Sequence, residues 1–211
     1  MISSEHPYWH VRSVVESRVD IAFVPLSYYT YVPRTVADTR RTWLVSRLEF
    51  LNERHIHDAM NSTPAGQELA VHSDLRLVDG TALHLAMVDM STTSKAHLAK
   101  LRAFLDEGSF EKIAWYSSGR SFHGYGSNLL AMSEWIRFMG LLLLANQPRL
   151  EPTVDPRWIG HRLVAGYAAL RWTRNTPHYL GIPFAVESSV RTSSSSLAVG
   201  PLGRPLRSGR A

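Results

Sequence analysis

The sequence predicts an α+β domain built on a small antiparallel sheet, and three local patterns carry this prediction. Asp79-Gly80 separates two apolar alternating runs, 75–78 and 82–88, which is the strongest short-range signal for a β-hairpin. Leucines and a phenylalanine then recur at helical spacing over residues 94–105. A further apolar run at residues 112–116 predicts a third strand. Strands and helices in this order are typical of the α+β class.

The remaining segments extend this core at both ends. Apolar spacing near 3.6 residues predicts helices over residues 128–144 and 35–59. Residues 21–24 and 164–172 are predicted to be strands. We therefore expect an RRM-like antiparallel sheet core with helices packed on one face, preceded by an N-terminal α/β extension. The other face of the sheet would then be free for a site.

Length and composition indicate one domain and a tail. The chain has 211 residues, of which 45% are hydrophobic, as expected for a globular protein with a buried core. We assign residues 1–187 to a single domain with its core at 70–185, and the Ser-, Arg-, Gly- and Pro-rich residues 188–211 to a disordered tail. No basic-then-apolar leader opens the sequence, and no apolar stretch is long enough to cross a bilayer. We expect a cytoplasmic protein without a membrane partner.

The net charge of +5 is concentrated in the tail. Residues 188–211 contain four arginines (191, 204, 207 and 210) and no acid, so subtracting 4 from +5 leaves about +1 for residues 1–187. A second basic stretch lies within residues 155–174, where arginines alternate with Trp158, Tyr167 and Trp172. Basic residues interleaved with aromatic ones favour contact with nucleic acid.

The absence of cysteine restricts the possible chemistry. It excludes disulfides, cysteine-ligated zinc and cysteine nucleophiles. A metal site would use His, Asp, Glu or backbone oxygens, and hard oxygen ligands suit magnesium or manganese.

Two places in the sequence combine residue types suited to phosphate or metal chemistry. Asp89 ends an apolar strand, where a carboxylate serves either as a turn former or as a metal ligand. Ser121 and His123 are two residues apart on an extended segment, so their side chains point the same way. With Arg120 and several glycines around them they could receive a phosphate, or His123 could be a hydrogen-bonded loop histidine.

Other candidate motifs are incomplete. His55 and His57 are two apart on a predicted helix and diverge, which disfavours a metal pair. The sequence has no Gly-x-Ser-x-Gly elbow for a serine hydrolase, and its glycines lack the Lys-Ser/Thr pair of a P-loop. Asp74 is expected opposite Leu85, about 13 Å from Asp89 at ~3.3 Å per residue, too far to share a metal with it.

The order of these features resembles the catalytic core of archaeo-eukaryotic primases and primase-polymerases. The resemblance covers about residues 70–185: a hydrophobic strand ending in Asp89, a helix, a strand entering Ser117-Ser118-Gly119-Arg120-Ser121-Phe122-His123-Gly124-Tyr125, a helix, then Asp155 and an arginine-rich segment. In that family the first motif is Asp-x-Asp or Asp-x-Glu, the second is Ser-x-His, and a third acid follows the next helix. Ser121-Phe122-His123 matches the second motif.

The resemblance implies a role for each matching residue. It implies that Asp89, Asp155 and His123 are catalytic, with Asp89 and Asp155 holding Mg²⁺ or Mn²⁺. It implies that nucleotide phosphates contact Arg120, Ser121, His123, Arg171 and Arg174, and that nucleic acid contacts Arg157, Arg162 and Trp172. The implied partners are a nucleoside triphosphate, a DNA or RNA template, and a helicase or other replication or defence proteins encoded separately.

Ser91 stands where the family has its second acid. A neutral hydroxyl is a poor ligand for a hard dication, so three readings stay open. The first is a nucleotidyltransferase that makes or extends primers. The second is a catalytically degraded, accessory protein that binds nucleotide or nucleic acid. The third is an RRM-like domain without a nucleotide site.

Overall fold

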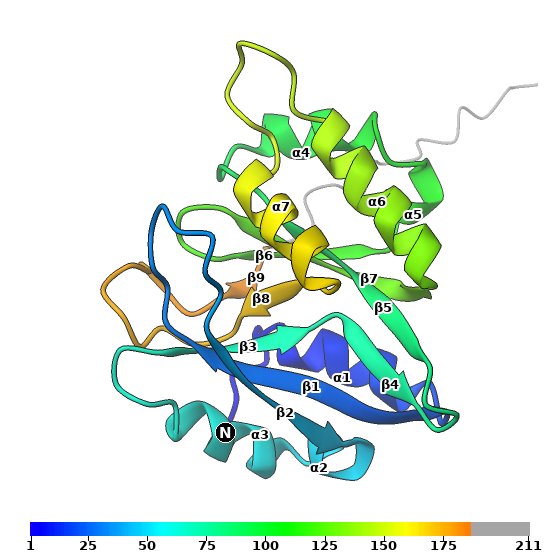
Figure 1. Cartoon of the computed structure of the whole chain (residues 1–211), viewed down its shortest axis with the longest axis vertical. Coiled ribbons are helices and arrows are strands. Elements are labelled where there is room, and N and C mark those ends of the chain that lie inside the picture. Colours follow the sequence, from blue (N-terminus) through cyan, green and yellow to red (C-terminus); the bar gives the residue numbers. More distant parts are fainter. Residues whose placement is uncertain (187–211) are drawn as a thin grey trace, which may run out of the picture.

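The computed structural model describes residues 1–186, which form one nine-stranded sheet with helices around it (Figure 1). The strands are β1 (Ile21–Tyr29), β2 (Arg40–Ser46), β3 (Glu68–His72), β4 (Asp74–Leu77), β5 (Ala82–Asp89), β6 (Ile113–Ser117), β7 (Phe122–Leu130), β8 (Ala169–Arg171) and β9 (Phe184–Ala185). The helices are α1 (Tyr8–Glu16), α2 (Arg47–Leu51), α3 (Glu53–Asn61), α4 (Lys95–Arg102), α5 (Glu107–Glu111), α6 (Met132–Leu144) and α7 (Pro156–Ala165). The predicted tail at residues 188–211 lies outside the described part of the chain.

The strand order is β8-β3-β1-β4-β5-β7-β6-β9, with β2 paired to β1 outside this path. β7 lies between β5 and β6 and is antiparallel to both. β1 pairs with β2 along one edge and with β3 and β4 along the other. The α+β class predicted from the sequence, with its antiparallel sheet, is confirmed.

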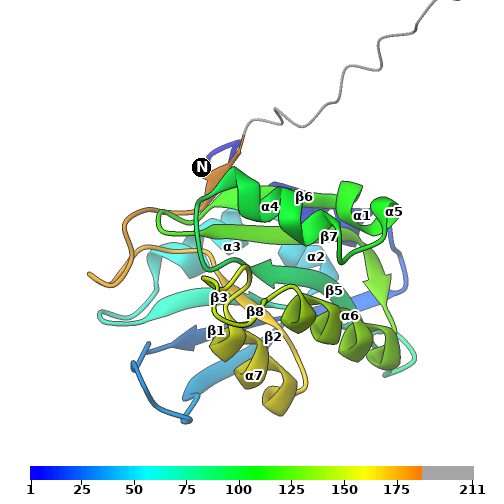
Figure 2. The same ribbon diagram turned by 90° about the horizontal axis from the view of Figure 1, so that it is seen from above.

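Helices cover both faces of the sheet, so the prediction that they pack on one face is wrong. Figure 2 shows α6 and α7 on one side of β5 and β7 and α1 on the other. On one side, Trp135 of α6 stacks on His84 of β5 with ring centroids 4.8 Å apart. On the other, the His10 ring of α1 lies 3.2 Å from the carbonyl oxygen of Gly126 in β7. A strand covered on both faces is apolar throughout, as β5 is at Leu85, Met87 and Val88.

The N-terminal extension contains a strand where a helix was predicted. Within 35–59 the chain first forms β2, in which Val45 is buried and Leu44 is 52% exposed. Trp43 packs on the Tyr28 ring of β1 at 4.6 Å. This two-residue alternation is that of a strand, and helix begins only at Arg47, after the N-cap Ser46, whose side chain and Glu49 form a capping box.

Three further boundaries differ from the prediction. The helix predicted from 128 begins at Met132, because β7 continues to Leu130. In the strand predicted over 164–172, residues 164–165 are the end of α7, Gly166 is its left-handed C-cap, and only β8 is extended. Asp74 pairs with His84 rather than Leu85, because the Leu77 amide bonds the carbonyl oxygen of Thr81 and lengthens the turn. Asp74 is therefore one residue farther from Asp89 than predicted.

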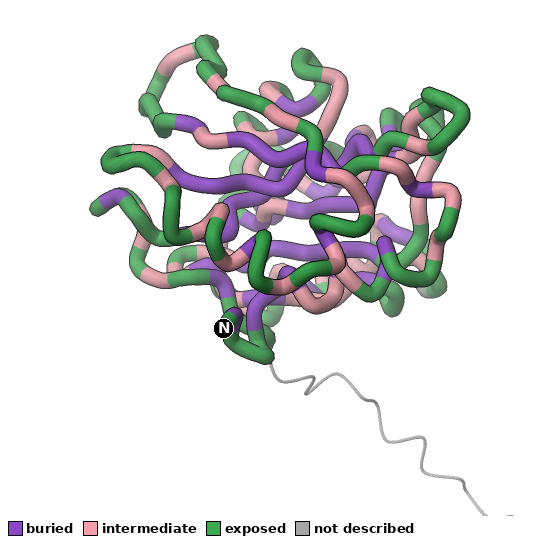
Figure 3. Tube along the Cα trace, turned by 90° about the horizontal axis from the view of Figure 1, so that it is seen from below, coloured by how far each residue is buried: buried purple, intermediate pink, exposed green. Residues whose placement is uncertain are grey.

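The core fills the space between the sheet and its helices. Its largest fully buried side chains include Trp135, Trp172, Tyr8, Tyr125 and Phe50. Figure 3 shows buried segments running along the strands and exposed ones at the connecting loops. None of the helices in residues 1–186 is both long enough and apolar enough to cross a membrane.

Candidate functional site

Two hollows meet at Asp89. The smaller one, called here the turn hollow, is also lined by Ser118, Arg120, Ser121, His178 and Leu180. The larger one, the arm hollow, is enclosed by residues 30–39, the connection between β1 and β2 that we call the arm, and by α7. Tyr31, Asp89, His123, Arg171 and Tyr179 line both hollows. The residues predicted at the ends of β5 and β6 are thus brought to one place.

Asp89 is the last residue of β5 and pairs with His123 across the β5–β7 ladder. Its Oδ1 lies 3.4 Å from the Ser121 hydroxyl and 3.7 Å from His123 Nε2. Burial, followed by the charge of Asp155, raises the pKa of Asp89 to about 7. A carboxyl group in this state exchanges its proton near neutral pH, and a cation bound to it would displace that proton.

Asp155 is joined to Asp89 through the backbone. Its amide donates to the Asp89 carbonyl oxygen at 2.9 Å. Its side chain caps α7, accepting hydrogen bonds from the amides of Arg157 at 2.8 Å and Trp158 at 3.1 Å. Pro156 in the first turn favours the same helix start. The cap fixes the second carboxylate next to the first.

A tight turn between β6 and β7 presents Ser121 and His123. The Ser118 amide donates to the Ser121 carbonyl oxygen at 2.9 Å, and the two hydroxyls lie 2.9 Å apart. Gly119 has φ +100°, and a Cβ there would lie 2.9 Å from the Leu180 Cβ, so the turn accepts only glycine without strain. The segment between Ser117 and Phe122 is therefore the turn of a β-hairpin.

His123 is buried and neutral. Burial, and then the charge of Arg171, lower its pKa to about 3. Its Nδ1 is buried without a hydrogen-bond partner in the described structure. A neutral imidazole can donate one hydrogen bond and accept another, which suits contact with a phosphate or a hydroxyl.

Arg171 is a buried clamp rather than a free phosphate ligand. Its guanidinium donates to the carbonyl oxygens of Ser118 and Gly181, each at 3.0 Å, and of Thr173. It also stacks on the Tyr179 ring, 4.0 Å from the centroid. Its positive charge lies beside both hollows, but most of its N–H donors already form hydrogen bonds within the protein. Arg174 is exposed, bonds the Tyr179 carbonyl oxygen, and lines neither hollow.

The residues predicted to contact nucleic acid have other surroundings. Arg157 is exposed at the start of α7 and donates to the Thr35 carbonyl oxygen at 3.0 Å. Arg162 is 3% exposed and forms an ion pair with Asp38 of the arm. Trp172 is fully buried against Tyr8 and Phe50, so the prediction that it contacts nucleic acid is wrong. Its place beside arginines reflects core packing, because alternate residues of a strand point to opposite faces.

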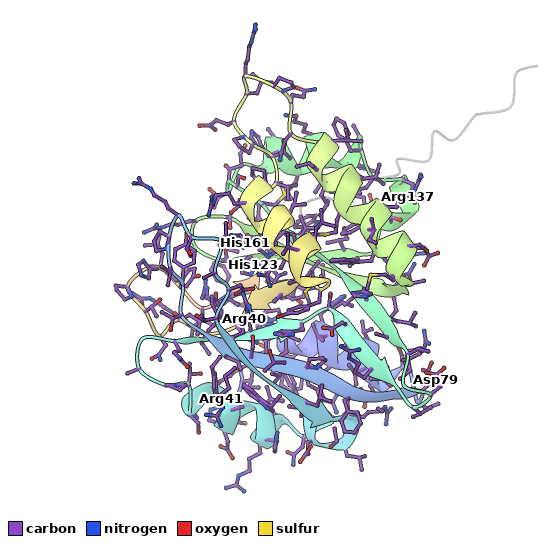
Figure 4. All side chains as sticks on the ribbon, in the orientation of Figure 1. Arg40, Arg41, Asp79, His123, Arg137 and His161 are labelled. Carbon is purple, nitrogen blue, oxygen red and sulfur yellow. The ribbon has the colours of Figure 1, made fainter. Side chains whose placement is uncertain are left out.

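Sequence reasoning missed the arm and His161. Tyr29, Tyr31, Arg34 and Arg40 all line the arm hollow although they precede the predicted core. Figure 4 shows Arg40, His123 and His161 gathered at the centre of the molecule, whereas Arg41, Asp79 and Arg137 lie at its periphery. The one signal in the sequence was the run of tyrosines followed by arginines between residues 28 and 41.

Comparison with known families agrees with this geometry. Residues 44–184 match the family model described as AEP-like, archaeo-eukaryotic primase 1D-like. The chain belongs to the archaeo-eukaryotic primase-like family. No curated protein and no solved structure matches it. The match to the primase-like model begins at residue 44, after the arm, so residues outside the matched segment build one wall of the site.

The acid set of this primase-like site is reduced. No group of three His, Asp or Glu side chains suited to one metal occurs in residues 1–186. Ser91 is exposed, lines neither hollow, and is held by its amide, which bonds the Thr153 carbonyl oxygen at 3.1 Å. Asp89 and Asp155 remain as adjacent carboxylates. Two carboxylates with phosphate oxygens and waters can hold one Mg²⁺ or Mn²⁺. They are too few to hold two such ions side by side.

Proposed function

We propose that this protein binds a nucleoside triphosphate in the turn hollow and transfers its nucleotidyl group to the 3′-hydroxyl of a primer or acceptor nucleotide on a DNA or RNA template, with release of pyrophosphate. One observation carries the proposal. Asp89 and His123 line both hollows, while Ser121 lines the turn hollow and Asp155 the arm hollow, so side chains from β5, β7, the β6–β7 turn and the start of α7 converge here. If Asp89 were only a turn former and His123 only a hydrogen-bonded loop histidine, these side chains would have no reason to lie together.

The turn hollow suits phosphate groups. Arg120 is exposed at its rim and supplies a mobile charge, and the Ser121 hydroxyl and neutral His123 supply hydrogen bonds inside it. The buried guanidinium of Arg171, which also lines this hollow, adds a fixed positive charge. Arg174 would contact phosphates only outside the hollow, at the protein surface.

Asp89 and Asp155 would hold a single Mg²⁺ or Mn²⁺. Such an ion supplies charge neutralisation on the triphosphate. A bound cation favours the ionised carboxylate, so it would lower the pKa of Asp89 from about 7.

A second function is favoured by Ser91, which stands where the family has its second acid. With only two carboxylates, the protein would bind nucleotide and nucleic acid as an accessory of a replication or defence system, without making primers. The chain order β5-α4-α5-β6-β7-α6, followed by the antiparallel bridge of Val154 to Met90, supports the inference of an RRM-like core for either function.

Primer extension separates the two functions. The protein is incubated with primed and unprimed templates, labelled ribo- or deoxynucleotides and Mn²⁺. Extension that is lost at least 100-fold in Asp89→Ala and retained in Asp79→Ala supports the transferase, because Asp79 lies on a distant exposed turn. Absence of extension with His123-dependent nucleotide binding supports the accessory function. Absence of both nucleotide and nucleic-acid binding overturns the proposal.

A further inference from the structure

We propose that the arm hollow binds the 5′-phosphate group of the acceptor nucleotide, with Arg34 and His161 as its free contacts. This rests on the proposed nucleotidyl transfer and assigns the second substrate. Residues 30–40 precede the segment matched by the family model, so the subsite is built by this chain's own extension.

The arm is held to the rest of the protein at three points. Asp38 is held between two arginines, with Arg40 Nε at 2.8 Å and Arg162 in a buried ion pair. Arg157 holds the Thr35 carbonyl oxygen at 3.0 Å. The Tyr31 ring packs edge-on to His178 at 5.5 Å. These contacts hold the arm over α7 and keep the hollow open between them.

A stacked wall separates the arm hollow from the turn hollow. The Arg40 guanidinium lies 4.2 Å from the centroid of the Tyr29 ring, and Arg171 lies 4.0 Å from that of Tyr179. The hydroxyls of the two tyrosines are 3.0 Å apart. Cations stacked on hydrogen-bonded aromatic rings keep fixed positions, so the wall orders positive charge on both sides.

Two groups in the arm hollow have no bonding partner among residues 1–186. Arg34 and His161 line the hollow, and neither forms a hydrogen bond or an ion pair with the described protein. Arg34 also has φ +58°, a conformation that costs a residue other than glycine energy. Strain kept at a lining arginine, rather than relieved by glycine or asparagine, indicates that its side-chain direction is used.

The charge of the hollow selects an anion. Five lining arginines (34, 40, 157, 162 and 171) face three lining aspartates (38, 89 and 155), an excess of two positive charges. Transfer of a nucleotidyl group requires both substrates to reach one carboxylate centre in line. The two hollows provide two approaches to Asp89. With the triphosphate in the turn hollow, the arm hollow is left for the acceptor.

The test is calorimetric titration with a nucleoside 5′-monophosphate or with the same nucleoside lacking the phosphate, in the presence of saturating nucleoside triphosphate. The variants are Arg34→Ala with His161→Ala, Arg120→Ala, and Arg41→Ala as the control. Arg41 follows Arg40 on β2 but lines a separate groove with Trp43 and His55, away from Asp89. Inorganic tripolyphosphate as competitor shows whether the phosphate alone suffices.

We expect the 5′-phosphate to improve the affinity for the nucleoside at least tenfold in the wild type and in Arg41→Ala. The double variant should lose this preference while its triphosphate affinity is unchanged, and Arg120→Ala should show the reverse. Equal affinity for the nucleoside and its 5′-monophosphate, or a preference that survives the double variant, overturns the inference and leaves the proposed function standing. Absence of triphosphate binding in the wild type overturns both.

Discussion

Burial and the neighbouring Asp155 carboxylate both disfavour the ionised form of the Asp89 side chain. Both raise the pKa of Asp89, to about 7, while burial keeps His123 neutral with a pKa of about 3. The pair is therefore uncharged over a wide pH range unless a cation or ligand ionises Asp89. Keeping an ionisable group buried in this state lowers the stability of the folded protein, whereas a residue with a purely structural role would not.

Replacing Asp89 by asparagine should stabilise the protein, and more so at high pH. A carboxyl group with a raised folded pKa favours folding while protonated and loses that contribution as the pH rises through about 7. Between pH 5.5 and 8 the advantage of Asp89→Asn in unfolding free energy should grow by about 1–2 kcal/mol. Urea denaturation at the two pH values measures it, and His123 contributes equally to both proteins. An advantage that does not change with pH would contradict the raised pKa.

At the scale of elements, the β6–β7 turn depends on Gly119. Gly119→Ala should destabilise the protein by about 2–4 kcal/mol, because it combines left-handed strain with a contact against Leu180. Gly80→Ala is the matched control, since its φ is +83° and its Cβ would meet nothing within 4 Å. That change should cost only about 1 kcal/mol. Thermal or urea unfolding compares them, and equal losses would show that the turn is not packed against the Leu180 segment.

Trp172 tests the distinction between core and interface. Trp172→Ala should lower the free energy of unfolding by about 3–5 kcal/mol, because the side chain is fully buried beside Tyr8 and Phe50. Trp172→Phe should restore most of the loss. Nucleic-acid affinity of the folded Phe variant should equal that of the wild type. A variant that is fully stable but binds DNA or RNA more weakly would place Trp172 at the interface after all.

Elements with a local signal were predictable, and elements defined by distant partners were not. The Asp79-Gly80 hairpin and the helix after it follow from turn chemistry and periodicity over a few residues. β2 was predicted to be helix because its apolar residues fit both the 3.6-residue period of a helix and the two-residue period of a strand. The packing of Trp43 on Tyr28, which decides for the strand, cannot be read from the sequence. The hairpin register shifted by one residue because Leu77 bonds Thr81, which the residue types alone do not specify.

At the scale of the whole molecule, the site is assembled from segments that lie far apart in sequence. Asp89, the Ser121–His123 pair and Asp155 could be found because each ends or begins an element with a recognisable pattern. The arm could not, because its place depends on the Asp38 ion pair with Arg162, 124 residues away. Arg171 looked like a phosphate ligand for the same reason, since its carbonyl partners come from three different segments.

The net charge makes a further whole-molecule prediction. Removing residues 188–211 deletes four arginines and no acid and takes the net charge from +5 to about +1. Non-specific DNA binding at low salt should weaken, and the slope of log affinity against log salt should become shallower. Fluorescence anisotropy over a salt series measures both. An unchanged slope would show that the tail does not contact the phosphate backbone.

The central claim is that Asp89 belongs to a cation-assisted nucleotide site. Its most direct test is calorimetric titration of a nucleoside triphosphate with and without Mn²⁺, using the wild type, Asp89→Asn and Asp79→Asn. We predict that Mn²⁺ strengthens triphosphate binding to the wild type and to Asp79→Asn, and that Asp89→Asn loses this gain by at least tenfold. Triphosphate binding that depends on Mn²⁺ equally in all three proteins would contradict the account.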